Sequence, residues 1–353
     1  MTNETNLTQE ELHTLIRQKV AAAGLQDSHA EEVAKHLVYA DAHGIHSHGA
    51  VRVDYYSERI DKGGINTHPT LDFEKTGEST GIFHGDNGMG HVVANEALKE
   101  AITMAKKSGL AAVGVSKTSH TGTMAYYVEK AAKEDLIAIA MCQSDPMVVP
   151  FGGAEPYYGT NPIGFAAPRA GKHPVVFDMA TTVQAWGKIL DARSKNKEIP
   201  DTWAVDDTGK PTTDPHSVKG LLPIAGPKGY GLMMMVDILS GMLLGLPFGK
   251  HVSSMYNDLS EGRDLGHFFI LIDPSRFTDL NMFKQHVDQS MDELKLIKPA
   301  PGFDEVLYPG ELSLVTQDRY KETGIPVVED IYDYLKSDTL HFDKYNNASP
   351  FAD

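Results

Sequence analysis

The sequence predicts an α/β protein made of a helical N-terminal part and a larger part in which strands alternate with helices. Apolar residues in the first sixty positions recur at helical spacing. Beyond Gly63 and Gly64, short apolar runs alternate with helical segments, which is typical of an α/β domain. We expect a helical domain over residues 1–75, an α/β domain over residues 76–326, and a tail, 327–353, that completes the helical domain.

Three helices are expected in the helical part. Each of the first two begins at a capping box and stops at a glycine, and a third covers residues 50–60. If the third helix begins near His48, then His48 and Arg52 share one face. The boxes are Thr8 with Glu11 and Ser28 with Glu31, and the glycines are Gly24 and Gly44.

In the larger part, four apolar runs are predicted to be buried strands, with two helices between or beside them. The tail is predicted to be helical over 327–340 and to lie against the N-terminal helices. The strands are 110–115, 136–141, 175–177 and 267–272, and the helices are 124–133 and 231–244.

The composition is that of an ordinary globular protein. Hydrophobic residues at 41% and charged residues at 23% of 353 residues exclude a disordered or collagen-like chain. The formal net charge is -16 and no Lys/Arg cluster stands out, so nucleic acid is not an expected partner.

The expected location is the cytoplasm. Cys142 is the single cysteine and cannot form an intrachain disulfide, and the first residues lack the basic end and apolar core of a signal peptide. The longest apolar run, 232–246, is short for a bilayer and is interrupted by Asp237 and Ser240. No membrane-spanning segment is expected.

The densest group of chemically active side chains lies in residues 41–52, DAHGIHSHGAVR. Its three histidines, His43, His46 and His48, raise the possibility of zinc. No cysteine pair or HExxH motif accompanies them, so no metal is expected. His43 fits a cap at the end of the second helix, where an imidazolium interacts favourably with the helix dipole.

Ser47, His48 and Arg52 fit such a cap poorly and are predicted to bind substrate. A guanidinium on a helix that follows a loop can hold a carboxylate through two parallel hydrogen bonds. The imidazole of His48, four residues earlier, can move a proton beside that carboxylate.

His120 lies in SKTSHTGTMAYY, residues 116–127, where a strand ends and a Ser/Thr/Gly loop leads into a helix. Catalytic groups often occupy such strand ends, and the ordinary pKa of an imidazole suits a general base. A surface histidine that caps the following helix is an equal alternative.

Polar residues also follow two other predicted strands. Ser144 and Asp145 open a long Pro/Gly-rich loop, where they can contact a ligand or form a plain turn. Asp178 ends a strand, and the residues after it, Met179 and Ala180, offer backbone groups to a ligand before a helix expected to start at Thr181 and Thr182. Helix capping by Asp178 or Thr181 explains the same residues.

The glycine-rich turn AGPKGYG, residues 225–231, carries Lys228 into an apolar helix. A cation and free amides at a helix start suit an anion such as a cofactor pyrophosphate, although a plain helix start fits too. No Rossmann fingerprint is present, since GDNGMG at 85–90 has the wrong glycine spacing. His286 and Asp288 are expected on an exposed helix face without a role.

Together these motifs resemble the malate/L-lactate/sulfolactate dehydrogenase family, whose NAD(P) domain is not a Rossmann fold. The resemblance runs from Thr8 almost to the end of the chain. It is carried by DAHGIHSHGAVR, SHTG, MCQSDPMVVPFGGAE, GTNP, DMATT, VQAWGK, IPDTWAVD and AGPKGYGLMMM.

The resemblance implies a helical domain joined to an α/β nucleotide-binding domain with a mostly antiparallel sheet. Within the family the chain resembles members that are cytosolic homodimers and oxidise (S)-ureidoglycolate to oxalurate with NAD in allantoin breakdown. Alternatives are another 2-hydroxy or 2-keto acid oxidoreductase acting on malate, sulfolactate or diketogulonate with NAD or NADP, and a non-enzymatic, metal-dependent binding module.

The resemblance also implies residue roles. Arg52 matches the substrate-carboxylate binder, His48 a catalytic histidine and His120 the proton acceptor. Ser47 and Asp145 are expected near the substrate. Cofactor contacts are expected from Ser144, Asp178, Met179, Ala180, Lys228, Gly310 and Glu311, although Leu312 departs from the pattern of relatives after the last two.

Overall fold

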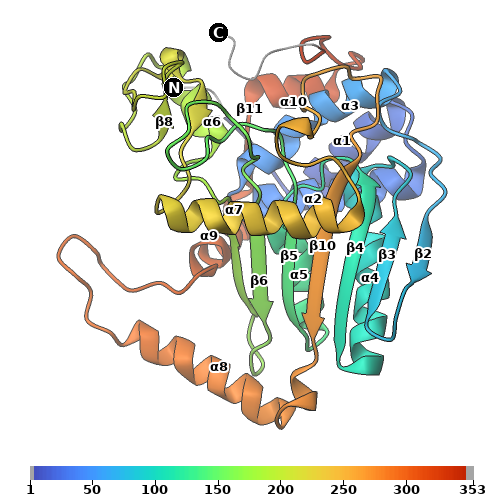
Figure 1. The fold of residues 1–353 in the computed structure, drawn as a ribbon, viewed down its shortest axis with the longest axis vertical. Coiled ribbons are helices and arrows are strands. Elements are labelled where there is room, and N and C mark those ends of the chain that lie inside the picture. The colour runs from blue at the N-terminus through green and yellow to red at the C-terminus, as the bar shows by residue number, and fades with distance from the viewer. Residues whose placement is uncertain (1–3, 347–353) are drawn as a thin grey trace.

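A computed structural model of the chain describes residues 4–346. A seven-stranded sheet forms its centre, with α4 (Gly90–Ser108) and α5 (Met124–Lys133) on one face and α7 (Pro227–Ser240) across the other (Figure 1). The N-terminal helices lie beyond one end of the strands, next to the last helix of the chain. The predicted α/β class is confirmed.

The sheet has the order β2-β3-β4-β10-β5-β6-β7. Only β3 and β4 pair in parallel, and every other neighbouring pair is antiparallel, so the expected mostly antiparallel sheet is confirmed. The four predicted strands are β4, β5, β7 and β10, and the sequence analysis missed β2, β3 and β6. The bounds are β2 (Asp72–Lys75), β3 (Thr80–His84), β4 (Leu110–Thr118), β5 (Ile137–Cys142), β6 (Ile163–Ala167), β7 (Val175–Met179) and β10 (Leu265–Ile272).

The side chains of β10 alternate between two apolar cores because successive residues of a strand point to opposite faces. Phe269 and Leu271 pack with α4 and α5, whereas Phe268 packs with Val236 of α7. The face under α4 and α5 is therefore buried, whereas α7 covers the other face only in part, since Ile139 and Ile270 are half-buried and Leu110 is exposed.

The helical layer consists of α1 (Gln9–Ala22), α2 (Asp27–Ala42) and α3 (Val53–Asp61). The chain's end closes it, because β1 (Glu4–Leu7) pairs with β11 (Ile325–Val328) and α10 (Glu329–Lys336) packs beside α1. Lys19 Nζ donates to the carbonyls of Ser337 at 2.5 Å and Thr339 at 3.0 Å. The predicted return of the tail to the N-terminal helices is confirmed, but of the helix predicted over 327–340 only Glu329–Lys336 forms, and residues 347–353 lie outside the described range.

One of the two predicted capping boxes forms. Glu11 N donates to Thr8 Oγ1 at 3.1 Å, and Thr8 N donates to Glu11 Oε2 at 2.8 Å. The box predicted at Ser28 is wrong, since α2 starts at Asp27 without a side-chain cap and Glu31 instead meets Lys35 at 3.2 Å.

The third helix was expected over residues 50–60, but it begins at Val53. Two 3-10 turns, His46–His48 and Ala50–Arg52, precede it. The buried Asp41 causes this, because its Oδ2 accepts from Ala50 N at 2.7 Å. Its carboxylate lies where a Cβ on Gly49 would stand, at 2.1 Å, so only glycine fits there.

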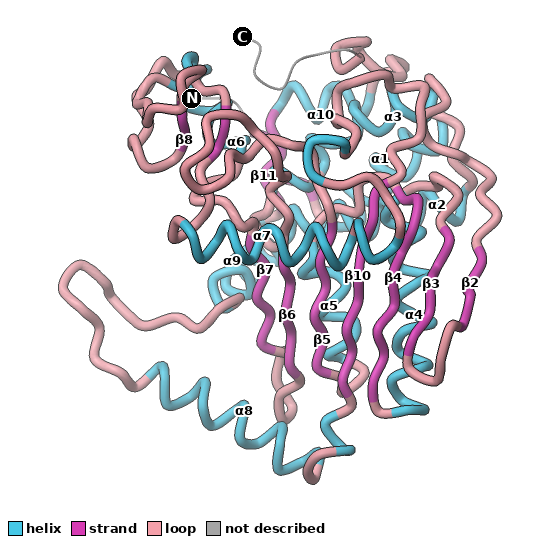
Figure 2. Tube along the Cα trace, in the orientation of Figure 1, coloured by secondary structure: helices cyan, strands magenta, loops and turns pink. Residues whose placement is uncertain are grey.

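The other elements surround the sheet (Figure 2). A small lobe contains α6 (Trp186–Ser194), β8 (Ala204–Val205) and β9 (Gly220–Leu221), while α8 (Leu280–Lys295) projects away before α9 (Glu311–Thr323) returns. No helix of residues 4–346 is both long and apolar enough to span a membrane.

Three details of these elements correct the sequence analysis. The helix expected at Thr181 begins at Trp186, because Thr181 N and Oγ1 both donate to Thr160 O. The helix α7 begins at Pro227, four residues earlier than predicted. Asp288, which was expected to have no role, accepts a hydrogen bond from Arg169 Nε at 2.9 Å.

Candidate active site

Two predicted site residues from distant parts of the sequence meet at the end of β4. His120 follows β4 in the loop before α5, and His48 belongs to the first 3-10 turn. Their rings stack with centroids 5.6 Å apart and planes 18° apart. The Nδ1 of His120 lies 2.7 Å from the hydroxyl of Tyr56 on α3. Helical layer and sheet therefore build this site together.

Ser47 and Arg52 lie beside the histidine pair. Arg52 Nε donates to the carbonyl of Ser47 at 2.7 Å, and Ser47 Oγ lies 3.0 Å from His48 Nδ1. The two terminal nitrogens of Arg52 have no hydrogen-bond partner within residues 4–346, so they remain available for a carboxylate.

The surroundings keep both histidines neutral at pH 7. Desolvation, aided by the positive charge of Arg52, lowers the pKa of His48 to about 3. Desolvation, then His48 and Arg52, hold the pKa of His120 well below its ordinary value. A neutral imidazole can accept a proton, and within the described chain neither Nε2 has a hydrogen-bond partner.

The three histidines of residues 41–52 have three different environments. His43 Nδ1 lies 2.7 Å from Tyr39 O at the end of α2, which confirms its place at the helix end. His46 Nδ1 lies 2.8 Å from Asp41 Oδ1, and His48 faces His120. They do not form a common ligand set in the described chain.

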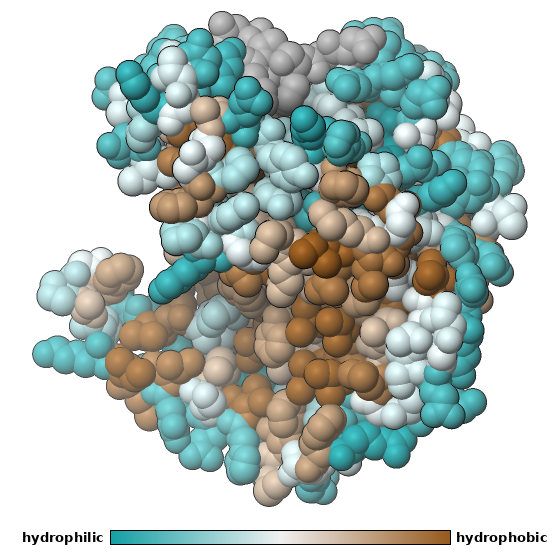
Figure 3. Space-filling view, viewed as in Figure 1, coloured by the Kyte–Doolittle hydropathy of each residue, from teal (hydrophilic) through white to brown (hydrophobic). Residues whose placement is uncertain are grey.

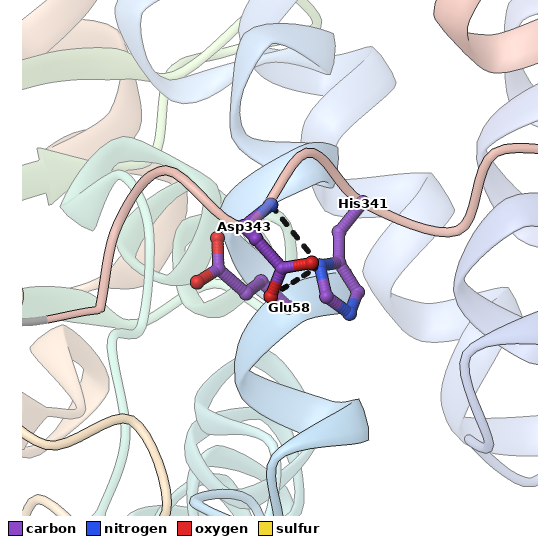
Figure 4. A group of neighbouring side chains, drawn as sticks. All are labelled: Glu58, His341 and Asp343. Carbon is purple, nitrogen blue, oxygen red and sulfur yellow. Dashed lines mark hydrogen bonds and ion pairs between the residues drawn. The ribbon is translucent and has the colours of Figure 1, made fainter.

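Glu58, His341 and Asp343 form the one group of three that could hold a metal ion among residues 4–346 (Figure 4). A cation already occupies the space between its carboxylates, because Lys62 Nζ lies 2.8 Å from Glu58 and 2.9 Å from Asp343. Glu58 also accepts backbone N–H groups from 344, 345 and 346. The group fastens the tail to α3.

The predicted cofactor residues gather at the same end of the sheet. β5 and β7 run in the same direction, so Ser144, after β5, and Asp178 to Ala180, at the end of β7, meet there. Ser144 Oγ lies 3.0 Å from Thr160 Oγ1. Asp178 Oδ2 accepts from Ala125 N at 2.9 Å, so it caps α5, and desolvation raises the pKa of Asp178 to about 6.

Lys228 approaches this end of the sheet from the start of α7, whereas Gly310, at the start of α9, lies beside Val176 near the beginning of β7. Ile224 N donates to Thr181 O at 2.9 Å, which brings the start of α7 next to the end of β7. Lys228, the second residue of α7, is exposed, and its amine has no partner within residues 4–346. These groups fit a bound anion such as a dinucleotide pyrophosphate.

Gly310 must be glycine, because its φ is +87° and a Cβ would lie 2.4 Å from Val176 O of β7. The next residue, Glu311, starts α9, and its carboxylate lies 2.7 Å from Lys295 Nζ. Of the two predicted cofactor residues, Gly310 lies against β7, whereas the side chain of Glu311 pairs with Lys295.

Asp145 forms a buried ion pair with Arg263. It is buried, and its Oδ1 accepts from the equally buried Arg263 at 2.5 Å. Its Oδ2 accepts from the backbone N of Met255. The carboxylate therefore ties the strand end after β5 to the segment before β10, and contact with substrate remains a prediction.

We expect Asp145→Asn to lower the free energy of unfolding by about 3–5 kcal/mol, because it leaves the buried Arg263 guanidinium without a counter-charge. Denaturant unfolding measures this change. The matched control is Asp318→Asn, which removes the exposed partner of Lys321 and should leave the transition almost unmoved. Equal midpoints for both variants would show that the buried pair contributes no stability.

Three residues of this site escaped the sequence analysis: Tyr56, His91 and Arg263. Tyr56 follows Arg52 by four residues, so helical spacing was the one available signal. His91, on α4, is fully buried with both ring nitrogens unpartnered, and its ring centroid lies 6.5 Å from that of His120. Nothing in the sequence marks it.

Comparison with known proteins identifies the family of this chain. A family model described as malate/L-lactate dehydrogenase matches residues 7–336. The chain belongs to this family. The resemblance inferred from the sequence is thereby confirmed, and so is the prediction that the chain is a dehydrogenase.

Individual members of the malate/L-lactate dehydrogenase family agree over nearly the whole chain. The ureidoglycolate dehydrogenase (NAD(+)) of Escherichia coli O157:H7 is 57% identical over 346 residues, which are 98% of this chain and 99% of the relative. Malate dehydrogenase from Entamoeba histolytica has a TM-score of 0.89 at 30% identity, covering 95% and 97% of the two chains. Sulfolactate dehydrogenase from Methanocaldococcus jannaschii has a TM-score of 0.88 at 36% identity, covering 94% and 96%.

Proposed function

We propose that this protein oxidises (S)-ureidoglycolate to oxalurate with NAD. The observation that carries the proposal is the pair of neutral imidazoles beside the open guanidinium of Arg52. That arrangement suits a 2-hydroxy acid, and the 57% identity to a ureidoglycolate dehydrogenase (NAD(+)) supports the particular substrate and cofactor.

In the proposed reaction Arg52 holds the substrate carboxylate and His120 Nε2 takes the hydroxyl proton. His48, stacked beside His120, lines the substrate site and assists the proton transfer. NAD supplies the acceptor for the hydride that leaves the same carbon. Ser144, the backbone of Asp178 to Ala180, Lys228 and the Gly310 turn would hold the cofactor, and Ser47 lies beside the substrate.

A substrate panel tests the proposal. Formation of reduced cofactor at 340 nm should be fastest with ureidoglycolate and NAD, and slower with NADP or with malate and sulfolactate, the substrates named for the two solved relatives. Faster turnover of malate or sulfolactate would assign the protein to another activity of the same family. Stoichiometric bound metal without NADH formation would point to a binding module.

We expect Arg52→Ala to raise KM about 10- to 100-fold, the cost of a charge-assisted pair of hydrogen bonds, with a smaller loss of kcat from misorientation. Arg52→Lys keeps the charge but loses the fork, and should recover only part of the affinity. Initial-rate kinetics give both constants. Unchanged KM and kcat in Arg52→Ala would remove this residue from the site.

We also propose a cytoplasmic homodimer that acts in allantoin breakdown. Apolar side chains gather over α7 in the middle of the face in Figure 3, and a patch of this kind marks an interface. A second copy covering this face should give a dimer in sedimentation equilibrium, which Ile238→Glu with Leu243→Glu should dissociate. A monomeric wild type would contradict this. The exposed members are Leu232, Met234, Met235, Ile238, Met242 and Leu243.

A further inference from the structure

Tyr56 is the one residue in the described chain that hydrogen-bonds the imidazole of His120. It lies on α3, four residues after Arg52, and is 1% exposed. Its hydroxyl oxygen stands 2.7 Å from His120 Nδ1 and makes no other hydrogen bond within residues 4–346. Burial raises the pKa of Tyr56, so the group remains a phenol.

The contact has a chemical consequence because a neutral imidazole carries a single N–H. Nδ1 is engaged by Tyr56, so Nε2 is the nitrogen left to receive a proton. For Nε2 to have a free lone pair, the hydrogen must be on Nδ1, and the phenol oxygen must accept it.

We propose that Tyr56 is a positioning residue that fixes His120 as the Nδ1–H tautomer and turns its Nε2 toward the substrate. The inference rests on the proposed role of His120 as the base. When Nε2 takes the proton, the same oxygen accepts from the imidazolium, which is stabilised by this hydrogen bond.

The groups around His120 leave Tyr56 as the natural acceptor. Besides Tyr56, the charged or titratable groups that act on His120 are His36, His48, His91, Arg52 and Arg263. All are neutral imidazoles or cations, and none is a carboxylate. A carboxylate at Nδ1 would favour the imidazolium at rest, whereas a phenol orients the ring and leaves it neutral.

The experiment compares Tyr56→Phe with Tyr55→Phe in the full-length protein. Each variant removes one hydroxyl from a buried tyrosine of α3, and the hydroxyl of Tyr55 makes no hydrogen bond to either histidine. We expect Tyr56→Phe to lower kcat about 10- to 100-fold with little change in KM, since a hydrogen bond to the developing charge is lost. Tyr55→Phe should keep both constants near the wild type.

Two further readouts separate positioning from a merely structural role. The acidic limb of the kcat/KM profile should move to lower pH in Tyr56→Phe, because the imidazolium loses its acceptor. In wild-type protein labelled with 15N-histidine, His120 should show the Nδ1–H tautomer, and in Tyr56→Phe it should shift toward Nε2–H.

The tautomer needs no substrate, so it decides the inference even if ureidoglycolate is not turned over or Tyr56→Phe does not fold. A wild-type Nε2–H tautomer overturns the inference, as does a Tyr56→Phe variant with wild-type kcat and pH profile. An Nδ1–H tautomer in a protein inactive toward ureidoglycolate supports the inference and contradicts only the proposed substrate.

Discussion

Replacing His120 with alanine lowers kcat by about 10²- to 10⁴-fold, the usual contribution of a positioned base. The stacked pair makes this result informative, because His48 presents a second neutral imidazole 5.6 Å away. His48→Ala should cost less, since His48 assists rather than receives the proton. Steady-state rates at saturating substrate measure both effects.

His286→Ala is the control for this pair, because His286 is exposed on α8, away from the sheet's active end. It should leave kcat unchanged. A His120→Ala enzyme with near-normal kcat, together with an inactive His48→Ala enzyme, would exchange the two roles.

Acid destabilises this protein below about pH 6.5 because His48 and His120 of the site and three further histidines are buried in neutral form. His36, His91 and His267 are fully buried, and desolvation lowers the pKa of each, to about 3 for the last two. The unfolded chain binds a proton at each site below its ordinary pKa of 6.5, whereas the folded chain does not. The stability is complete above pH 6.5 and is lost as pH falls toward 3.

Five such protons correspond to a slope of up to about 7 kcal/mol per pH unit near pH 5. Asp178, whose pKa is raised to about 6, binds its proton first in the folded state and offsets about a sixth of this slope. Urea unfolding between pH 6.5 and 5 measures the net value. Carboxyl groups with a lowered pKa contribute only at lower pH, so this window isolates the histidines.

His267→Phe tests the origin of the slope. The His267 ring has no hydrogen-bond partner and packs between Tyr127 and Phe269, so a phenyl ring can replace it. The slope should fall by about 1.4 kcal/mol per pH unit. The exposed His286→Gln variant should keep the full slope, and an unchanged slope in His267→Phe would place the acid sensitivity elsewhere.

Local signals predicted local structure well. The Thr8 capping box, the helix over Met124–Lys133 and the four predicted strands needed only neighbouring residues. The prediction at Ser28 failed because Glu31 lies near groups on α1 and α2 that compete for its carboxylate. The start of α3 moved because buried Asp41 holds the turn from outside it.

The chemistry of the site was legible in the sequence, but its assembly was not. His48 and Arg52 were identified by their residue types and four-residue spacing, and His120 by its strand-end position, and the structure brings them together. Tyr56 and His91 carry no motif, since their importance comes from burial against His120. Burial is a property of the packed layers, and a single sequence does not specify which helix face meets which strand end.

The pairing of β1 with β11 and the hydrogen bonds from the tail to Glu58 affect how the chain folds during translation. Residues 4–61 are made long before residues 325–346, which supply their partner strand and the amides that satisfy a fully buried carboxylate. Until translation is nearly finished, this segment exposes apolar surface and is open to chaperones. The half of the stacked histidine pair contributed by His48 is therefore completed only when residues 325–346 have been made.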